Sequence, residues 1–397
     1  MIRRHFLQLF LAIFVGNLFL SCSSTTDKDF SFVISSDQRN HAAEQFRTKD
    51  YTIAGYEAIK KVGQGSFMVV VGDLDPPQAT RDLMDKVFGK DYPWYVIRGN
   101  HDKDEASMEY LRSLNRGDKS FSHLVKKGPA GSEETTYSFD WNDIHFVMLN
   151  LFFDGKTDNA KEANVVPELL AWLEEDLKQN KKEHILVFGH KPLFSVLDID
   201  NGTQRHVGEV LDKFPDNSLK FQQVLLKYHV TAYVSGHTHA ASYANVNGLW
   251  ILNSGHVYGF EDTYTPELLF AAISKEIEKG KTAGVNESKA LANVLAADNE
   301  EVKKIIYTLD PIPGKEDSDL TDEQTLKALT TFYADYRKGG ASANEISDKF
   351  WKNAGWRAST FLKVKISSGT GLVEFYRDKD FTGNYALLHS LVLFEKK

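Results

Sequence analysis

Five groups of polar residues with metal-binding side chains occur along the chain, and each directly follows a run of apolar, strand-forming residues. The groups are Asp37, Gly72-Asp73, Gly99-Asn100-His101-Asp102, Gly189-His190-Lys191-Pro192 and Gly236-His237-Thr238-His239. Asp, Asn and His side chains bind hard or borderline divalent cations. In open α/β sheets, ligands bind beyond the carboxyl ends of the strands, so these strand ends predict one shared site. The arrangement indicates a metal-dependent hydrolase.

The ordered set carries this interpretation, because each member alone has an ordinary structural explanation. A lone His more often packs in a core or lies on the surface, and Gly72-Asp73 alone would as often be a simple turn. Pro192 could simply close a strand. A glycine beside each ligand lets the backbone turn sharply and approach a metal closely. Their shared placement at strand ends favours the functional reading.

Segments with helical periodicity separate the strand-like runs, at 51–61, 78–88, 166–181 and 218–228. Residues 136–139 and 144–150 have the pattern of a strand pair. Strands that alternate with helices of this length predict an α/β domain with largely parallel pairing.

The chain changes character after residue 258. Helical stretches are predicted at 265–279, 288–307 and 321–337, and strand patterns return only at 361–366 and 372–376. We therefore expect a core over 31–264, a helical insertion or lid over 265–358, and closing strands of the core over 359–397. The alternative is a separate C-terminal helical domain with its own hairpin.

Composition limits the class of protein. The chain has 397 residues, of which 26% are charged and 12% aromatic, as in globular proteins. A formal net charge of -8 argues against nucleic-acid binding through phosphate neutralisation. The single cysteine excludes a disulfide within the chain.

The N-terminus has the pattern of an export signal. Arg3-Arg4 precede an apolar run over 6–20, which is too short for a membrane span of about 20 residues. Cys22, the single cysteine, stands where a signal peptide over 1–21 would be cut, and this resembles a bacterial lipoprotein signal. A lipidated Cys22 with a tether over 22–30 would anchor an exported protein on the periplasmic or cell-surface side of a membrane. The alternative is an uncleaved anchor with an incidental cysteine.

Together, the five groups resemble those of the calcineurin-like metallophosphoesterase superfamily over about 32–258. Its usual motifs are Asp-x-His, Gly-Asp-x-x-Asp, Gly-Asn-His-Asp/Glu, Gly-His-x-Pro and Gly-His-x-His. The resemblance implies a four-layer α/β/β/α sandwich of two mixed sheets. It also implies two divalent ions, Mn, Fe or Zn, about 4 Å apart, which clamp a phosphoryl group.

The same resemblance assigns roles to individual residues. Asp73 would bridge the two metals. The remaining ligands would be Asn100, His190 and His237 for one metal, and Asp37 and His239 for the other. His101 would be catalytic, facing the substrate to protonate the leaving oxygen or stabilise phosphoryl charge, and Asp102 would orient its imidazole and raise its basicity. A metal-bound hydroxide would be the nucleophile.

The first departure from the motifs is Asp37-Gln38-Arg39, where Arg39 replaces the usual His. A protonated guanidinium is no normal metal ligand, so this metal would bind weakly or take Gln38, Asn40, His41 or water. Arg39 could instead bind the substrate phosphate with its planar fork, or pair with a carboxylate. The second departure is Pro76, which stands where the motif has its second Asp; Asp75 falls one residue early.

The resemblance therefore implies an enzyme that hydrolyses a small phosphomonoester or phosphodiester outside the cytoplasm. A lipoprotein that binds a phosphate-bearing ligand or partner through the same site, with weakened catalysis, is the alternative, and a phosphoesterase with one tightly bound metal lies between them. Among the other histidines, His145 is expected to be structural, and His184 and His206 to be surface or capping residues.

Overall fold

The computed structural model describes residues 29–38, 48–200, 202, 204, 206–257, 274–275, 277–286, 289–290, 359–378 and 383–395. Cys22, Arg39, Asn40 and His41 lie outside these residues, as do the expected signal peptide and most of the tether and of the expected helical insertion. Among the described helices, none is long and apolar enough to cross a bilayer.

Two mixed sheets form the centre of the molecule. The first has the order β13-β12-β11-β1-β2-β3. Its strands are β1 (Phe30–Ser35), β2 (Met68–Val70), β3 (Trp94–Val96), β11 (Thr360–Ser367), β12 (Thr370–Arg377) and β13 (Ala386–Phe394). The second has the order β4-β5-β6-β7-β8-β10-β9. Its strands are β4 (Leu124–Lys127), β5 (Tyr137–Trp141), β6 (Ile144–Leu149), β7 (His184–Gly189), β8 (Ala232–Ser235), β9 (Ala241–Val246) and β10 (Leu249–Ser254).

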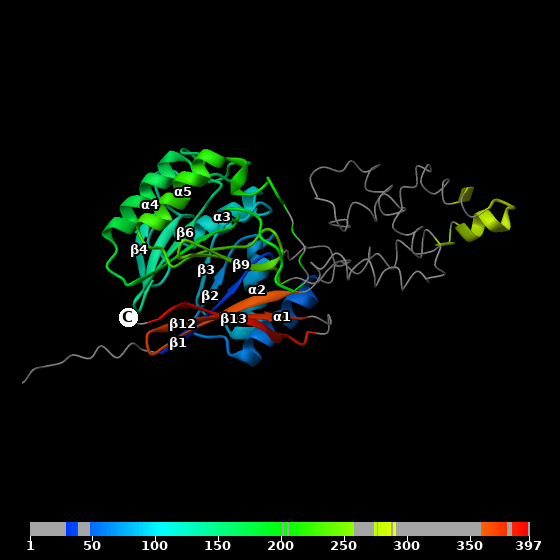
Figure 1. Cartoon of the computed structure of the whole chain (residues 1–397), viewed down its shortest axis with the longest axis horizontal. Helices are drawn as coiled ribbons and strands as arrows, with labels where there is room; N and C mark the ends of the chain where they lie inside the picture. Colours follow the sequence, from blue (N-terminus) through cyan, green and yellow to red (C-terminus); the bar gives the residue numbers. More distant parts are fainter. Residues whose placement is uncertain are drawn as a thin grey trace, which may run out of the picture.

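Helices cover the outer faces of both sheets. They are α1 (Thr48–Val62), α2 (Pro77–Phe88), α3 (Glu105–Ser113), α4 (Pro167–Gln179), α5 (Pro215–Lys227) and the short 3₁₀ helix η1 (Leu211–Lys213). Figure 1 shows α4 and α5 together on one outer side and α1 and α2 on the opposite one. The expectation of an α/β fold with two mixed sheets is confirmed.

Three apolar layers hold these elements together. The inner faces of the two sheets meet in an aromatic core, in which the ring centroids of Phe32 and Phe146 lie 5.3 Å apart. A second layer packs α4 and α5 on one sheet, and a third packs α1, α2 and α3 on the other. In α4, Leu169, Leu173 and Leu177 are buried at helical spacing. Pro167 stands at its start, where a missing N–H costs no hydrogen bond.

Parallel pairing brings the five polar groups to one edge. In the first sheet β1, β2 and β3 are parallel, and in the second β6, β7, β8 and β10 are parallel. The residues that follow β1, β2, β3, β7 and β8 therefore emerge where the carboxyl ends of both sheets meet. The fold thus supplies the shared strand-end position that the sequence predicts.

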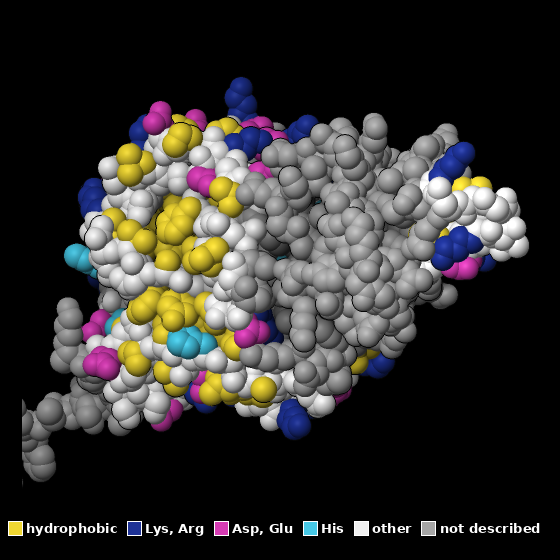
Figure 2. Space-filling model, turned by 45° about the vertical axis from the view of Figure 1, so that its right-hand side comes forward, with side chains coloured by type: hydrophobic (Ala, Val, Ile, Leu, Met, Phe, Trp, Pro, Cys, Tyr) yellow, Lys and Arg dark blue, Asp and Glu magenta, His cyan; other side chains and the backbone are white. Residues whose placement is uncertain are grey.

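The last strands belong to the first sheet. β11 pairs antiparallel with β1, with Phe32 opposite Val364, and β12 and β13 extend the sheet from there. Figure 2 shows apolar side chains gathered on one described face of the molecule. Among the exposed large apolar side chains of the described residues are Leu387 and Val392, both on the edge strand β13.

Candidate metal centre

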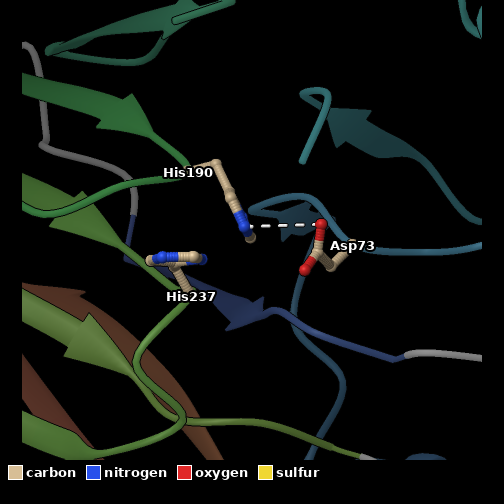
Figure 3. A group of neighbouring side chains, drawn as sticks. All are labelled: Asp73, His190 and His237. Atoms are coloured by element: carbon tan, nitrogen blue, oxygen red, sulfur yellow. Dashed lines mark ion pairs between the residues drawn. The ribbon is translucent and has the colours of Figure 1, made fainter. Parts of the chain in front are cut away.

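Asp73, His190 and His237 converge at the carboxyl ends of the strands. Their ligand atoms all lie within 4.8 Å of one another, and the three side chains are buried (Figure 3). Asp73 follows β2 of the first sheet, whereas His190 and His237 follow β7 and β8 of the second. The group therefore forms only when the two sheets pack together.

Hydrogen bonds orient the two imidazoles. Nδ1 of His190 lies 2.7 Å from the carbonyl oxygen of Val71 and donates to it, which turns Nε2 toward Asp73 Oδ1 at 3.4 Å and Asn100 Oδ1 at 2.9 Å. A backbone carbonyl on the far nitrogen is the usual support of a metal-binding imidazole. Nε2 of His237 has no hydrogen-bond partner among the described residues. Both rings thus present Nε2 to the centre.

The electrostatics of the two imidazoles differ. Burial would lower the pKa of His190, but the Asp73 carboxylate outweighs it and raises that pKa to about 9. Burial, with the positive charges of neighbouring groups, holds the pKa of His237 well below its usual range. His237 is therefore neutral, which is the form that binds metal, while a cation would displace the proton from His190.

Asp37 and His239 lie beside this group. Oδ2 of Asp37 accepts hydrogen bonds from the Ser36 hydroxyl at 2.7 Å and from the His237 backbone N–H at 2.9 Å. Its Oδ1 lies 3.3 Å from Nε2 of His239. Burial raises the pKa of Asp37 to about 7, and the nearby Asp73 carboxylate adds to the effect. The structure thus brings all six expected ligands to one edge.

The donor set fits divalent cations. Nε2 of His237 and Oδ1 of Asp37 are buried and make no hydrogen bond to a described residue, although buried polar atoms normally find partners. Four of the expected ligands also adopt the left-handed backbone conformation, at φ 51° for Asp37, 55° for Asp73, 69° for His237 and 57° for His239. Such conformations are uncommon outside glycine and gather at functional sites.

Two glycines let the ligand loops come this close. A Cβ at Gly99 would collide with the carboxylate and backbone nitrogen of Asp73. A Cβ at Gly236 would lie 2.5 Å from both Asp37 Oδ2 and Ser36 Oγ. The glycines of these motifs are therefore required by close approach of neighbouring loops.

His101 is the exposed member of the site. Its backbone N–H donates to Asp73 Oδ1 at 2.8 Å, and its side chain is 40% exposed with Nε2 4.0 Å from Asp73 Oδ2. The imidazole can therefore reach both the ligand group and a substrate from solvent.

Comparison with known proteins agrees with this geometry. The model of the family "Calcineurin-like phosphoesterase" matches residues 43–241, half of the 397-residue chain, and covers every expected metal ligand except Asp37. The chain belongs to the calcineurin-like phosphoesterase family.

Among curated proteins, the chain is similar to tartrate-resistant acid phosphatase type 5. The protein of Oryctolagus cuniculus is 30% identical over 175 residues, or 41% of this chain and 48% of that protein. The protein of Rattus norvegicus is 24% identical over 213 residues, or 51% of this chain and 61% of that protein. The chain thus spans about half to three fifths of the relatives it matches. A solved structure, "GAP50 the anchor in the inner membrane complex of Plasmodium", is 11% identical with a TM-score of 0.43, covering 93% of this chain and 90% of that one, a likeness too distant to add to the assignment.

The structure gives Asp102 different partners from the one expected. Its Oδ2 accepts from the backbone N–H groups of Asp73 at 2.9 Å and Gly99 at 2.8 Å. Its Oδ1 accepts from those of Leu74 at 2.8 Å and Asp75 at 2.9 Å. All four hydrogen bonds join the buried carboxylate to backbone N–H groups. Asp102 fastens two ligand loops together instead of orienting the imidazole.

Two further residues near the metal centre were not predicted from the sequence. The ring of His206, expected to be a surface or capping residue, stacks on that of His237 with centroids 4.5 Å apart. Arg98 is 2% exposed, lies over the ring of Phe152 at 4.0 Å and donates to Asn159 Oδ1 at 2.7 Å. Burial lowers the pKa of Arg98 to about 10 against the opposing Asp102 and Asp73 charges. Its position directly before Gly99 was the one available clue.

Other sequence expectations have plain outcomes. Gln38 is buried and donates from its side-chain nitrogen to Ser35 Oγ at 2.7 Å. His145 lies within the second sheet between Asp140 at 2.7 Å and Asp176 at 3.0 Å, in the structural role expected. The ring of His184 stacks on that of Phe394 with centroids 3.4 Å apart, outside the metal centre. Arg39 lies outside the described residues, so its role stays a prediction.

Proposed function

We propose that this chain hydrolyses a small phosphomonoester at a centre that holds two divalent cations. The observation that carries the proposal is the buried Asp73, His190 and His237 group, whose ligand atoms lie within 4.8 Å of one another. The exposed imidazole of His101 beside it supplies the second requirement, a proton donor that a substrate can reach.

The donor atoms divide between two cations. One cation would be held by Asn100, His190 and His237, and the other cation by Asp37 and His239. Asp73 would bind both cations. Divalent cations bound here would neutralise phosphoryl charge and activate water for attack on phosphorus. With one ligand fewer than usual, the Asp37 and His239 position would bind its cation more weakly than the other position.

His101 would act on the leaving group. Its backbone N–H is fixed to Asp73, which limits the positions that the ring can take. Its Nε2 lies 4.0 Å from Asp73 Oδ2, beside the ligand group. The proton on this nitrogen would pass to the departing oxygen, which lowers the barrier to cleavage of the P–O bond.

A monoester is favoured over a diester by the relatives. The similar curated proteins are named acid phosphatases, although the chain spans only about half to three fifths of their length. We also propose that the protein is exported and held at a membrane through a lipidated Cys22. This rests on residues 1–22 of the sequence, and mass spectrometry of the mature N-terminus would test it.

The experiment compares an aryl phosphomonoester with an aryl phosphodiester as substrates for the full-length chain. Mn, Zn and Fe are added in turn, with a chelator as the metal-free arm. We expect metal-dependent turnover, faster with the monoester, and a 10²- to 10⁴-fold loss in His101→Ala. The matched control is His123→Ala, which removes an exposed imidazole that instead meets the Trp141 ring edge to face.

Each other result has a definite meaning. Faster cleavage of the diester would overturn the monoester assignment alone. Full activity in His101→Ala would remove its role as proton donor. Folded protein without turnover in any metal would overturn the proposed hydrolysis and favour a protein that binds phosphate-bearing ligands.

A further inference from the structure

Arg377, near the end of β12, is a buried cation that the metal centre does not use directly. Its side chain is 1% exposed. Nη1 donates to Asp198 Oδ1 at 2.7 Å, Nη2 donates to Asp198 Oδ2, and Nη1 also lies 3.5 Å from Asp200 Oδ2. A two-pronged guanidinium–carboxylate pair is strong and fixes the relative orientation of its partners. Arg377 therefore holds Asp198 in one position.

Asp198 belongs to the loop that leaves the metal centre after β7. This loop begins at His190 and runs to His206, whose ring stacks on that of His237. Asp198 Oδ2 also accepts the backbone N–H of Ala241 at 2.9 Å, and Ile199 donates its N–H to the Ala241 carbonyl at 2.9 Å. The partner of Arg377 is thus joined to the chain just after the ligand loop that ends at His239.

A second path leads from Arg377 to the same ligand loop. Nε of Arg377 donates to Thr360 Oγ1 at 3.0 Å, and the backbone N–H of Thr360 donates to the carbonyl of His256 at 2.6 Å. Nδ1 of His256 lies 3.3 Å from the carbonyl oxygen of His239. Both paths run through buried groups, in which hydrogen bonds are hard to exchange for water.

We propose that Arg377 is a positioning residue for the hydrolysis at the metal centre. It fixes Asp198 and, through Ala241, Thr360 and His256, the ligand loop that ends at His239, from a strand of the other sheet. This inference rests on the proposed function. It also assigns a role in catalysis to the closing strands, which lie beyond the part of the chain that the family model matches.

The loss of a buried charge pair explains why replacing Arg377 would lower catalysis strongly. Removing the guanidinium takes the charged partner from the buried Asp198 carboxylate, which keeps backbone N–H groups such as those of Ala241 and Asp200, so Asp198 is held less firmly against the chain after His239. His190 and His237 follow β7 and β8 directly, so their positions depend less on this loop. We therefore expect the metal that His190 and His237 hold to stay bound in Arg377→Met while catalysis falls.

The test compares Arg377→Met with Lys365→Met in the full-length chain. Lys365 is the matched control, since it forms an ion pair with Glu374 at 2.6 Å on the same pair of strands and has no contact with Asp198. The measurements are kcat and KM with an aryl phosphomonoester, bound metal by elemental analysis, and hydrogen exchange of peptides within 191–210. In Arg377→Met we expect kcat/KM to fall at least tenfold, bound metal to stay, and exchange of 191–210 to quicken. Lys365→Met should match the wild type.

A second variant covers the case in which Arg377→Met does not fold. Arg377→Lys keeps the charge but cannot form the two-pronged pair with Asp198, so it should give intermediate kcat/KM and intermediate exchange. Unchanged kcat/KM and unchanged exchange in a folded variant would overturn the proposal. Loss of all bound metal together with activity would also overturn it, because that pattern denotes general destabilisation. If the wild type shows no turnover, the proposed function fails, and the exchange comparison alone decides whether Arg377 holds the loop.

Discussion

The buried carboxylate of Asp102 gives a direct test of how the ligand loops are held together. In Asp102→Asn one oxygen becomes an NH₂ group of nearly the same size. Each oxygen of Asp102 accepts two backbone N–H groups, so either orientation of the new amide leaves two N–H donors facing another donor. The substitution therefore removes hydrogen bonds without removing volume.

The free-energy cost of Asp102→Asn follows from the number of hydrogen bonds lost. A hydrogen bond to a charged group is worth about 1.5–3 kcal/mol, so two lost bonds cost about 3–6 kcal/mol. A typical domain has a free energy of unfolding of only about 5–15 kcal/mol. We expect Asp102→Asn to lose a large part of its stability and, since Asp73 is among the fastened residues, to bind metal weakly.

Urea unfolding of the wild type, Asp102→Asn, Asp104→Asn and His101→Ala measures this cost. Asp104 caps α3 by accepting the Ser107 N–H at 3.0 Å, and Asn caps a helix as well as Asp does, so Asp104→Asn should be nearly neutral. His101→Ala should keep its stability while losing turnover. A stable, metal-loaded Asp102→Asn that fails only in turnover would refute this reasoning and return Asp102 to the role of orienting His101.

Three further predictions concern other parts of the molecule. Gly99→Ala should weaken metal binding at least tenfold, because its Cβ meets the Asp73 carboxylate and overpacking costs about 1–3 kcal/mol; titration with Mn measures it. Burial would lower the pKa of His145, but hydrogen bonds to two carboxylates outweigh it and raise that pKa to about 9. Protonated His145 therefore contributes up to about 3 kcal/mol to the free energy of unfolding. This contribution is complete below pH 6.5 and is lost as the pH rises through 9. Urea unfolding at pH 6 and 10 should therefore show a stability difference between the wild type and His145→Gln at pH 6 only, and a constant difference would contradict the prediction. His206→Ala should lower kcat/KM about tenfold with bound metal retained, since its ring supports His237; unchanged kinetics would contradict this role.

Much of the fold is visible in the sequence because its signals are local. The helix predicted at 166–181 is α4, whose buried residues recur at helical spacing. The hairpin of β9 and β10 was not predicted, although Asn247-Gly248 at its turn, both with positive φ, is a strong signal for such a connection. The helix α3 was also missed, although Asp104 stands at its N-cap. Both the hairpin and the helix α3 have a local sequence signal that could have predicted them.

Other features depend on contacts between distant parts of the chain, which no local pattern encodes. The expected ligands could be named because each follows its own strand. The role of Asp102 could not, because its partners are backbone groups up to 29 residues away. The Arg377 and Asp198 pair joins residues 179 apart and exists only once both sheets are assembled. His206 has no motif, and its place on His237 depends on how the intervening loop folds.

The charges at the strand ends explain why metal binding and folding should be linked. Asp37, Asp73 and Asp102 are buried within one region, and burying carboxylates without partners is costly. Four backbone N–H groups stabilise the Asp102 carboxylate, while burial and the nearby Asp73 charge raise its pKa. Asp73 instead lies beside the imidazole of His190, and Asp37 beside that of His239. A divalent cation bound by a carboxylate and its neighbouring imidazole would take the place of the proton that the two groups share. Such a cation, present at a thousand times its dissociation constant, would stabilise the fold by about 4 kcal/mol. The side chain of His101 is 40% exposed and is not among these buried carboxylates, so we expect His101→Ala to remove turnover without loss of the fold.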